Sequence, residues 1–280
     1  MSQSIVVPKS RSLSLGWLGV AAIVLGYSIL FLVNLLLPLS QGSFSTRLWD
    51  WTQLALALAA LAVLVIQHRL LTAATAALGL GLAALSALSY SLNAPGAALM
   101  LQESLAIWAC FSAGVVLCKQ LERGKIPAFQ LPLGRLGKSL AFGMLVAIPL
   151  ALVNNLYFYA SQGVFRLQNV FYSAFEALRP AIYEEIVFRF FVLALCFYLL
   201  RSSRSPRLVS LVALVLAVVP HSLNHLPDLF LENPMMGLAM LVATSLLFGL
   251  PMAVLQIKKN LEAAVAFHWL IDFARFLFGF

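Results

Sequence analysis

Residues 15–37 read LGWLGVAAIVLGYSILFLVNLLL, a run of 23 residues without a charged side chain. A helix needs about 20 such residues to cross the ~30 Å hydrocarbon layer of a bilayer, so this run predicts a membrane span. Lys9 and Arg11 precede it, as they would in a signal peptide, but the run is too long for one and lacks a small-x-small cleavage site. We therefore expect it to be kept as the first span.

The rest of the chain has the same apolar character. Of its 280 residues 62% are hydrophobic and 10% are charged, and the mean hydropathy is +0.96. Soluble domains are about 45–50% apolar, so a soluble core could not bury this excess. The apolar runs are continuous and not alternating, which predicts helices and not barrel strands. The expected fold is an all-α, polytopic transmembrane bundle of about nine spans. These spans are residues 15–37, 48–66, 70–90, 97–118, 139–160, 178–200, 208–226, 235–257 and 261–280.

Positive charge is concentrated in every second connection between these runs. The basic connections hold Lys9 and Arg11, His68 and Arg69, the segment 119–138, Arg201, Arg204 and Arg207, and Lys258 and Lys259. The positive-inside rule then predicts a cytoplasmic N-terminus and an external C-terminus, in an inner or plasma membrane. Anionic lipid headgroups explain the net charge of +8 better than nucleic acid does. The expected partner of this charge is thus the lipid bilayer, with no nucleic acid.

Segment 119–138 divides the chain into two parts. It mixes cations with Pro127 and Pro132, which is typical of a linker. Residues 1–138 hold four spans and this cytoplasmic linker, whereas residues 139–280 hold most of the intramembrane ionisable groups. We therefore expect the chemistry in the second part. Cys110, Cys118 and Cys196 have no CxxC spacing and lie in or beside apolar runs, so they predict core packing.

The intramembrane polar residues gather in three runs, which are YEEIVFR (183–189), HSLNH (221–225) and HWLID (268–272). A charged side chain at mid-bilayer costs at least about 2.5–3.5 kcal/mol, so such residues persist where function or pairing retains them. Glu185 and Arg189 are four residues apart and predict an ion pair on one helix face. Glu184 points about 100° away from Glu185, so we expect its carboxylate to lie outside this ion pair and to have another role.

The four-residue spacing recurs in the other two runs. It places His221 with His225, and His268 with Asp272, on one helix face each. Three helices could thus direct Glu184, His225, His268 and Asp272 at one buried, water-accessible point. Glu103, Asn154 and Asn155 fit no such pattern, and hydrogen bonds between helices are their expected role.

The order of these residues resembles the CPBP family of intramembrane proteases, which includes the CAAX prenyl endopeptidases and the bacteriocin self-immunity proteins. Glu184, Glu185 and Arg189 match its EExxxR motif, and His268 with Asp272 match its HxxxN/D motif. The resemblance covers about residues 180–272. The second motif, FxxxH, fits less well. His225 has the Leu226-Pro227 context but lacks the phenylalanine four residues earlier, where His221 stands.

His221 is the alternative second-motif histidine, although Ala217 would then replace the phenylalanine. We favour His225 because of its Leu-Pro context. The resemblance implies a hydrolase that cleaves a peptide bond in a membrane-associated protein or peptide. It implies Glu184 as the base that activates water, with the second-motif histidine as its partner. It also places His268 and Asp272 on the oxyanion side. Because an acidic Asp272 would repel an oxyanion, we expect it to orient His268.

Three alternatives stay open. Two histidines and a carboxylate are also a zinc-ligand set. The chain lacks the HExxH helix of zincins, however, and a glutamate-activated water needs no metal, so no cofactor is certain and a divalent metal such as zinc is the alternative. A chain of Glu, His and Asp residues also suits a proton-coupled transporter. The altered second motif would further suit a catalytically idle immunity or scaffold protein.

The charge pattern also predicts on which side of the membrane the site lies. It places the site in the outer half of the membrane, which favours an exported or membrane peptide over a cytosolic prenylated one.

Overall fold

The computed structural model describes residues 10–39, 42–93, 96–121 and 133–280, and its regular elements there are helical. The long uninterrupted helices are α1 (Ser10–Leu36), α2 (Phe44–Ile66), α3 (Ala73–Tyr90), α4 (Ala97–Lys119), α5 (Leu133–Gln162), α9 (Pro206–Asn224) and α13 (Leu261–Leu277). Two further rods are each interrupted by a π-helical turn. They are α7 (Leu178–Glu184), η3 (Glu185–Phe190) and α8 (Phe191–Leu199), and then α11 (Pro234–Thr244), η4 (Ser245–Gly249) and α12 (Leu250–Lys258). Two short helices, α6 (Val170–Glu176) and α10 (Pro227–Glu232), complete the path.

Local capping explains where several helices begin. The side chains of Ser43, Thr72 and Asn260 each accept a hydrogen bond from a backbone N–H in the first turn that follows. Such caps satisfy donors that have no partner inside the helix. Pro206 and Pro234 stand in the first turn of α9 and α11, where the missing N–H is not needed.

The expectation of about nine spans agrees with this architecture. Within the described residues, seven helical segments are long and apolar enough to cross a membrane. The other two rods, α7–η3–α8 and α13, carry the charged residues that the sequence singled out. Their charged side chains turn inward, since Glu185, Arg189 and Asp272 are buried. Counted with the seven, these two rods give the nine expected, and their polar faces are covered by protein.

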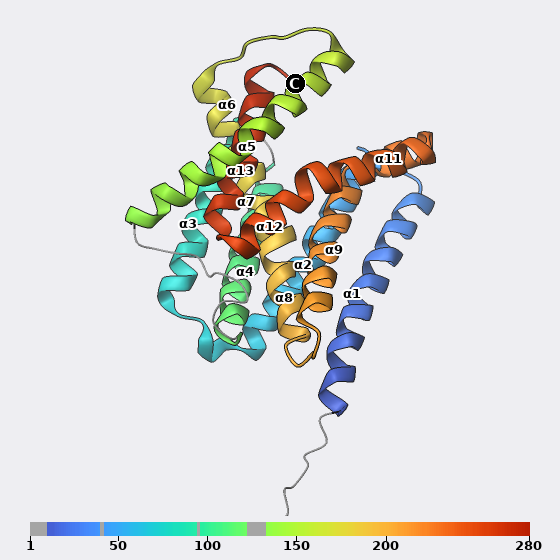
Figure 1. Cartoon of the computed structure of the whole chain (residues 1–280), viewed down its shortest axis with the longest axis vertical. Helices are drawn as coiled ribbons and strands as arrows, with labels where there is room; N and C mark the ends of the chain where they lie inside the picture. The colour runs from blue at the N-terminus through green and yellow to red at the C-terminus, as the bar shows by residue number, and fades with distance from the viewer. Residues whose placement is uncertain (1–9, 40–41, 94–95, 122–132) are drawn as a thin grey trace, which may run out of the picture.

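A large core joins α2, α4, α8 and α9. Ala60, Phe111, Phe191 and Ala217, one from each helix, are buried there. Figure 1 shows these helices roughly parallel, with α1 against one side of them. Cys110 and Cys196 belong to the same core and Cys118 packs against it, as the sequence predicts.

A second, smaller core joins α5, α12 and α13. It contains Ala147, Met252, Phe267 and Ile271. Helices α5 and α11–α12 run obliquely to the first group of helices (Figure 1). The polar runs on α7–η3, α9 and α13 lie where the two cores meet, as the contacts below show.

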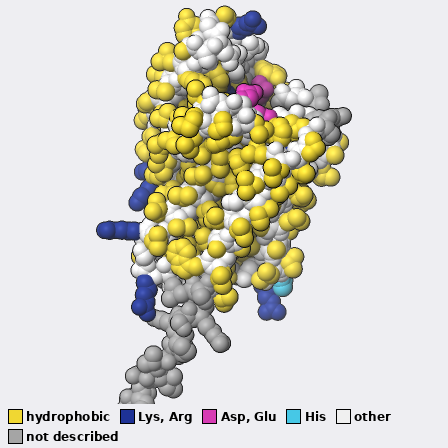
Figure 2. Space-filling model, turned by 90° about the vertical axis from the view of Figure 1, so that its right-hand side faces the viewer, with side chains coloured by type: hydrophobic (Ala, Val, Ile, Leu, Met, Phe, Trp, Pro, Cys, Tyr) yellow, Lys and Arg dark blue, Asp and Glu magenta, His cyan; other side chains and the backbone are white. Residues whose placement is uncertain are grey.

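The surface of the bundle is apolar. Leu15, Leu36, Leu167 and Phe171 are among many large hydrophobic side chains that are mostly exposed, and hydrophobic atoms cover most of the face in Figure 2. In water such a surface would be unfavourable, whereas lipid tails solvate it. The chain is an integral membrane protein.

Several of the basic connections lie at one end of the bundle, although the α12–α13 connection with Lys258 and Lys259 lies higher in Figure 1. The amino end of α1 and the α2–α3, α4 and α8–α9 ends gather at the bottom of Figure 1, and Lys119 Nζ donates to the Leu70 carbonyl across this end at 2.9 Å. Lys9 and most of the predicted linker lie outside the described residues.

The α1–α2 and α9–α10 connections lie at the opposite end and are joined by Asp228. Its carboxylate accepts from the amides of Phe44 and Ser45 at 3.0 Å each and from the Ser45 hydroxyl at 2.6 Å. Partial burial raises the pKa of the Asp228 carboxyl, but these hydrogen bonds lower it by more. The pKa of Asp228 therefore lies below its ordinary value.

Candidate active site

The two adjacent glutamates occupy different environments. Glu184 ends α7 and its side chain is 14% exposed, whereas the Glu185 side chain is fully buried. Successive helical residues point about 100° apart, so one carboxylate faces the cavity described below and the other faces the protein interior. Glu184 is thus the carboxylate that a substrate or water can reach.

Glu185 is held in a π-helical turn. Its carboxylate forms an ion pair with Arg189, as the four-residue spacing predicts. Its backbone carbonyl accepts from the side-chain amide of Gln256 on α12, at 3.2 Å. A π-turn shifts the usual backbone pairing, and a buried carbonyl needs another donor. Gln256 supplies that donor and joins α12 to the site.

The contacts of His221 fix its tautomer. Arg189 Nη2 lies 2.9 Å from His221 Nδ1, and His221 Nε2 lies 2.8 Å from Glu184 Oε2. A guanidinium can only donate, so Nδ1 accepts and the ring proton sits on Nε2. His221 therefore donates to Glu184 and orients this carboxylate from the side opposite α13.

His268 lies among three carboxylates. Its Nδ1 is 2.9 Å from Glu185 Oε1, and its Nε2 is 3.2 Å from Asp272 Oδ2 and 3.7 Å from Glu184 Oε2. Ionised carboxylates accept and do not donate, so a ring with a proton on each nitrogen satisfies these contacts. His268 thereby connects the two glutamates of α7–η3 to α13.

Asp272 is shared between His268 and an arginine. Its Oδ1 lies 3.2 Å from Arg275 Nη2, while Oδ2 faces His268. The Asp272 side chain is buried and that of Arg275 is about one third exposed. The predicted His268–Asp272 pair is therefore extended by a cation three residues further along the same helix.

His225 lies at the exposed side of the same cavity. It is the C-cap residue of α9, and its ring centroid is 5.3 Å from that of His221. Trp49 of α2 packs against both rings, with centroid distances of 5.4 Å to His221 and 4.9 Å to His225. An indole from the first half of the chain thus packs beside the two imidazoles.

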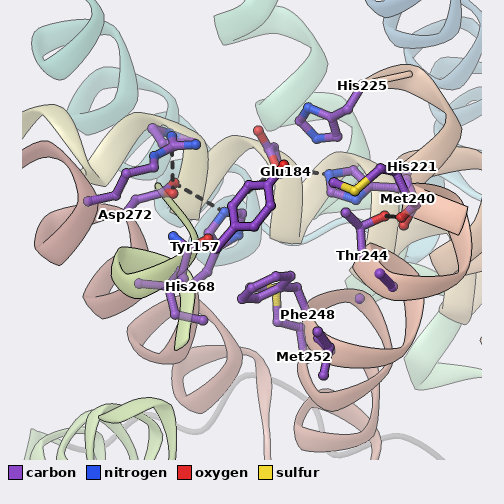
Figure 3. Close-up of a pocket in the computed structure, with 18 of the residues that line it drawn as sticks. Tyr157, Glu184, His221, His225, Met240, Thr244, Phe248, Met252, His268 and Asp272 are labelled. Atoms are coloured by element: carbon purple, nitrogen blue, oxygen red, sulfur yellow. Dashed lines mark hydrogen bonds and ion pairs between the residues drawn. The ribbon is translucent and has the colours of Figure 1, made fainter. Parts of the chain in front are cut away.

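One end of a cavity of about 420 Å³ is lined by polar side chains, which are Glu184, Arg189, His221, His225, His268, Asp272 and Arg275. Figure 3 shows Glu184 between His221 and His225 on one side and His268 and Asp272 on the other. The remaining wall is mainly apolar, from α5 and from the rod α11–η4–α12. It includes Val153, Asn154, Tyr157, Phe158, Met240, Thr244, Leu247, Phe248 and Met252. A polar end and a long apolar wall suit a ligand that is itself largely apolar.

A metal ion fits the described polar groups poorly. Glu184, His221 and His225 have ligand atoms within 4.8 Å of one another, which is close enough for a zinc site. To bind zinc through Nε2, however, His221 would need its proton on Nδ1, where the Arg189 guanidinium already donates. A ligating histidine normally turns its other N–H toward an acceptor. Binding through Nδ1 would instead bring the ion against that guanidinium.

The structure brings together all seven residues that the sequence proposed. They are Glu184, Glu185, Arg189, His221, His225, His268 and Asp272. Of the two histidine candidates, His221 forms the hydrogen bond to Glu184. A ring nitrogen of His225 lies within 4.8 Å of a Glu184 carboxylate oxygen but forms no such bond. The residue favoured from the Leu-Pro context is therefore not the one that contacts the carboxylate.

Other polar residues differ in how far the sequence predicted their contacts. The Glu103 carboxylate accepts hydrogen bonds from the Ser86 hydroxyl at 3.0 Å and from the Arg179 guanidinium at 2.7 Å. The prediction of hydrogen bonds between helices is confirmed for this residue. Asn155 instead donates to the Ala151 carbonyl of its own helix, and Asn154 lines the cavity.

Four residues at the site escaped the sequence reasoning. Arg275 stands three residues after Asp272 and could have been found from that spacing. Trp49, Asn154 and Gln256 come from other helices and reach the site only through tertiary packing. The sequence marks Asn154 only as an intramembrane polar residue expected to form hydrogen bonds between helices, and it does not mark Trp49 or Gln256.

Comparison with known proteins supports the same region. Residues 166–274 match the model of the type II CAAX prenyl endopeptidases, described as Rce1-like. The match begins before α6 and ends within α13, so it contains the three polar runs but not α1 to α5. No curated protein and no solved structure matches the chain. Over residues 166–274 the chain is thus similar to the Rce1-like type II CAAX prenyl endopeptidases.

Proposed function

We propose that the chain is an intramembrane endopeptidase that hydrolyses a peptide bond in a membrane-associated protein or peptide, using water activated by Glu184. One observation carries the proposal. The Glu184 carboxylate reaches an apolar cavity, accepts from His221 at 2.8 Å, and lies 3.7 Å from His268. A base, a group that orients it and a second donor are what acyl hydrolysis requires.

The reaction can be written through these groups alone. Glu184 takes a proton from water while the water oxygen attacks the peptide carbonyl. The oxyanion that forms is stabilised by the Nε2–H of His268, because a donor aimed at developing charge lowers the barrier in a dry site. The C–N bond then breaks, and the proton on Glu184 passes to the leaving amine. His221, and not His225, is assigned as the partner that orients Glu184.

Glu185 and Arg189 position the two histidines. Arg189 donates to His221, and Glu185 accepts from His268. Because each of these buried groups satisfies a nitrogen of a reacting imidazole, replacing either would change ring orientation as well as charge. No metal step is needed.

The test is cleavage of labelled membrane peptides by the purified protein in vesicles. We expect Glu184→Gln to lower cleavage by at least about a hundredfold, because general-base catalysis contributes about 10²–10⁴ in rate. Glu232→Gln, which removes an exposed carboxylate in α10, is the matched control and should cleave normally. A chelator should have no effect.

Two outcomes would contradict the assignment. Normal cleavage by Glu184→Gln would mean that another group is the base, and loss of cleavage with chelator would mean that a metal takes part. The transporter alternative is addressed in the same vesicles. Proton flux that depends on Glu184, without any cleavage, would favour it.

A further inference from the structure

Arg275 extends the predicted His268–Asp272 pair into a chain of three groups. Asp272 Oδ2 lies 3.2 Å from His268 Nε2, and Asp272 Oδ1 lies 3.2 Å from Arg275 Nη2. Each carboxylate oxygen thus has its own partner. Arg275 lies one residue beyond the region that matches the family model, so the match does not account for it.

Aromatic faces hold the Arg275 guanidinium in place. Its central carbon lies 4.7 Å from the Phe276 ring centroid and 5.8 Å from that of Phe158. The Phe158 ring in turn stacks on Phe280, with centroids 5.7 Å apart. Cation–π contacts of this kind favour a fixed guanidinium over a freely rotating one. Arg275 also lines the cavity, at its partly exposed side.

The charges of the cluster show why this cation matters. Three carboxylates face three groups that carry positive charge when His268 is doubly protonated. They are Glu184, Glu185 and Asp272 against Arg189, Arg275 and His268. The cluster is then neutral before the reaction begins. Without Arg275 it would carry one uncompensated negative charge.

That uncompensated charge would sit beside the developing oxyanion. Asp272 contacts the same His268 nitrogen that the proposed reaction uses as a donor. In a low-dielectric cavity, repulsion between a carboxylate and an oxyanion is strong. A carboxylate with no counter-charge would also hold the Nε2 proton more tightly for itself.

We propose that Arg275 is a positioning residue that neutralises Asp272, so that His268 can direct its Nε2–H to the oxyanion. The inference rests on the proposed peptidase function. It predicts that Arg275 is needed only while residue 272 carries a negative charge. A neutral amide at residue 272 should remove that need.

A double-mutant cycle tests this dependence. We expect Arg275→Gln to lower kcat at least about tenfold with little change in KM, within the range that contacting pairs show in such cycles. Arg275→Lys should retain much of the activity, because it keeps the charge. In an Asp272→Asn background, Arg275→Gln should change kcat by less than about twofold. Arg201→Gln, which removes a cation from the α8–α9 connection, is the control for loss of a guanidinium.

The outcomes separate this inference from the proposed function. An equal loss from Arg275→Gln in both backgrounds, or no loss in either, would overturn the positioning role. If the wild-type chain cleaves no peptide, the proposed function fails. The Asp272–Arg275 pair is then tested by thermal unfolding in detergent of the four chains of the cycle. They are the wild type, Arg275→Gln, Asp272→Asn and the double variant. A fall in unfolding temperature from Arg275→Gln that is absent in the Asp272→Asn background supports the pair, and equal falls refute it.

Discussion

His221 and His225 lie one turn apart on α9 but have different environments. His221 bridges Arg189 and Glu184 through its two nitrogens, whereas His225 packs its ring against Trp49 at the exposed side of the cavity. Only His221 therefore depends on a defined tautomer. This difference makes the two residues separable by mutation.

We expect His221→Gln to lower kcat far more than His225→Gln. If the glutamine N–H takes the position of Nε2 and donates to Glu184, its oxygen does not lie at the position of Nδ1, so Arg189 would lose its buried acceptor. The predicted loss for His221→Gln is about ten- to a hundredfold, since leaving a buried donor or acceptor without its partner costs about 1–3 kcal/mol. Peptide cleavage assays would measure it, with His68→Gln at the far end of the bundle as the control. Equal losses at both positions would contradict the assignment.

Sequence spacing was informative within a helix and weak between helices. Four-residue separations correctly predicted the pairs Glu185–Arg189 and His268–Asp272, because a helix repeats every 3.6 residues whatever surrounds it. Whether His221 or His225 meets Glu184 depends on how far α9 is shifted along α7. That shift is set by packing between helices, so the flanking Leu226-Pro227 carried no information about it.

At the scale of helices, α5 and α13 approach unusually closely. A Cβ atom added at Gly143 would lie 2.1 Å from the Ala263 carbonyl oxygen, which is backbone and cannot turn aside. Small residues at such crossings let two membrane helices pack through their backbones. This contact sets the position of α13 and therefore of His268 and Asp272.

Gly143→Ala should lower the unfolding temperature in detergent and also reduce peptide cleavage. The added methyl must push α5 and α13 apart, and overpacking of this kind costs about 1–3 kcal/mol. A Cβ atom added at Gly137, on the same helix, would meet nothing within 4 Å. Gly137→Ala should therefore leave both measurements unchanged or slightly improved, since alanine is the better helix former. Equal effects at the two glycines would show that the close crossing is not important.

The long helices could be predicted from the sequence and the π-helical turns could not. An uncharged run of about 20 residues has few alternatives to a spanning helix. A π-turn adds one residue to a turn without any change in hydrophobic pattern, so residues 178–200 read as one regular span. The short helices α6 and α10 were also missed, because they lie in connections too short to show a period.

On the scale of the whole molecule, charge and chemistry lie toward opposite ends. Arg201 and Arg204 lie in the connection before α9 and Arg207 lies in its first turn, whereas His221 lies in its last turn. By the positive-inside rule the site would then face the outer side of the membrane. A substrate that is exported or embedded in the outer leaflet would meet this requirement.

Cysteine labelling in intact cells can test this orientation. We expect a membrane-impermeant maleimide to label Glu232→Cys from outside, because α10 lies at the end away from the basic connections. Ser202→Cys, in the α8–α9 connection, should be labelled only after the membrane is opened. The wild-type chain, whose cysteines pack in or against the large core, serves as the blank. The reverse labelling pattern would place the site on the cytoplasmic side.

The π-helical turn η3 makes the length of the chain between Glu185 and Phe190 critical. Deleting one residue between Glu185 and Arg189 would restore a regular α-helix, and α7 and α8 would keep about the same relative rotation, because the wide turn is what absorbs the extra residue. Glu185 and Arg189 would then be only three residues apart, and their buried contacts with each other, with His268 and with His221 would no longer match. Insertions and deletions in this segment should therefore be more harmful than most substitutions, even though Glu184 would still face the cavity.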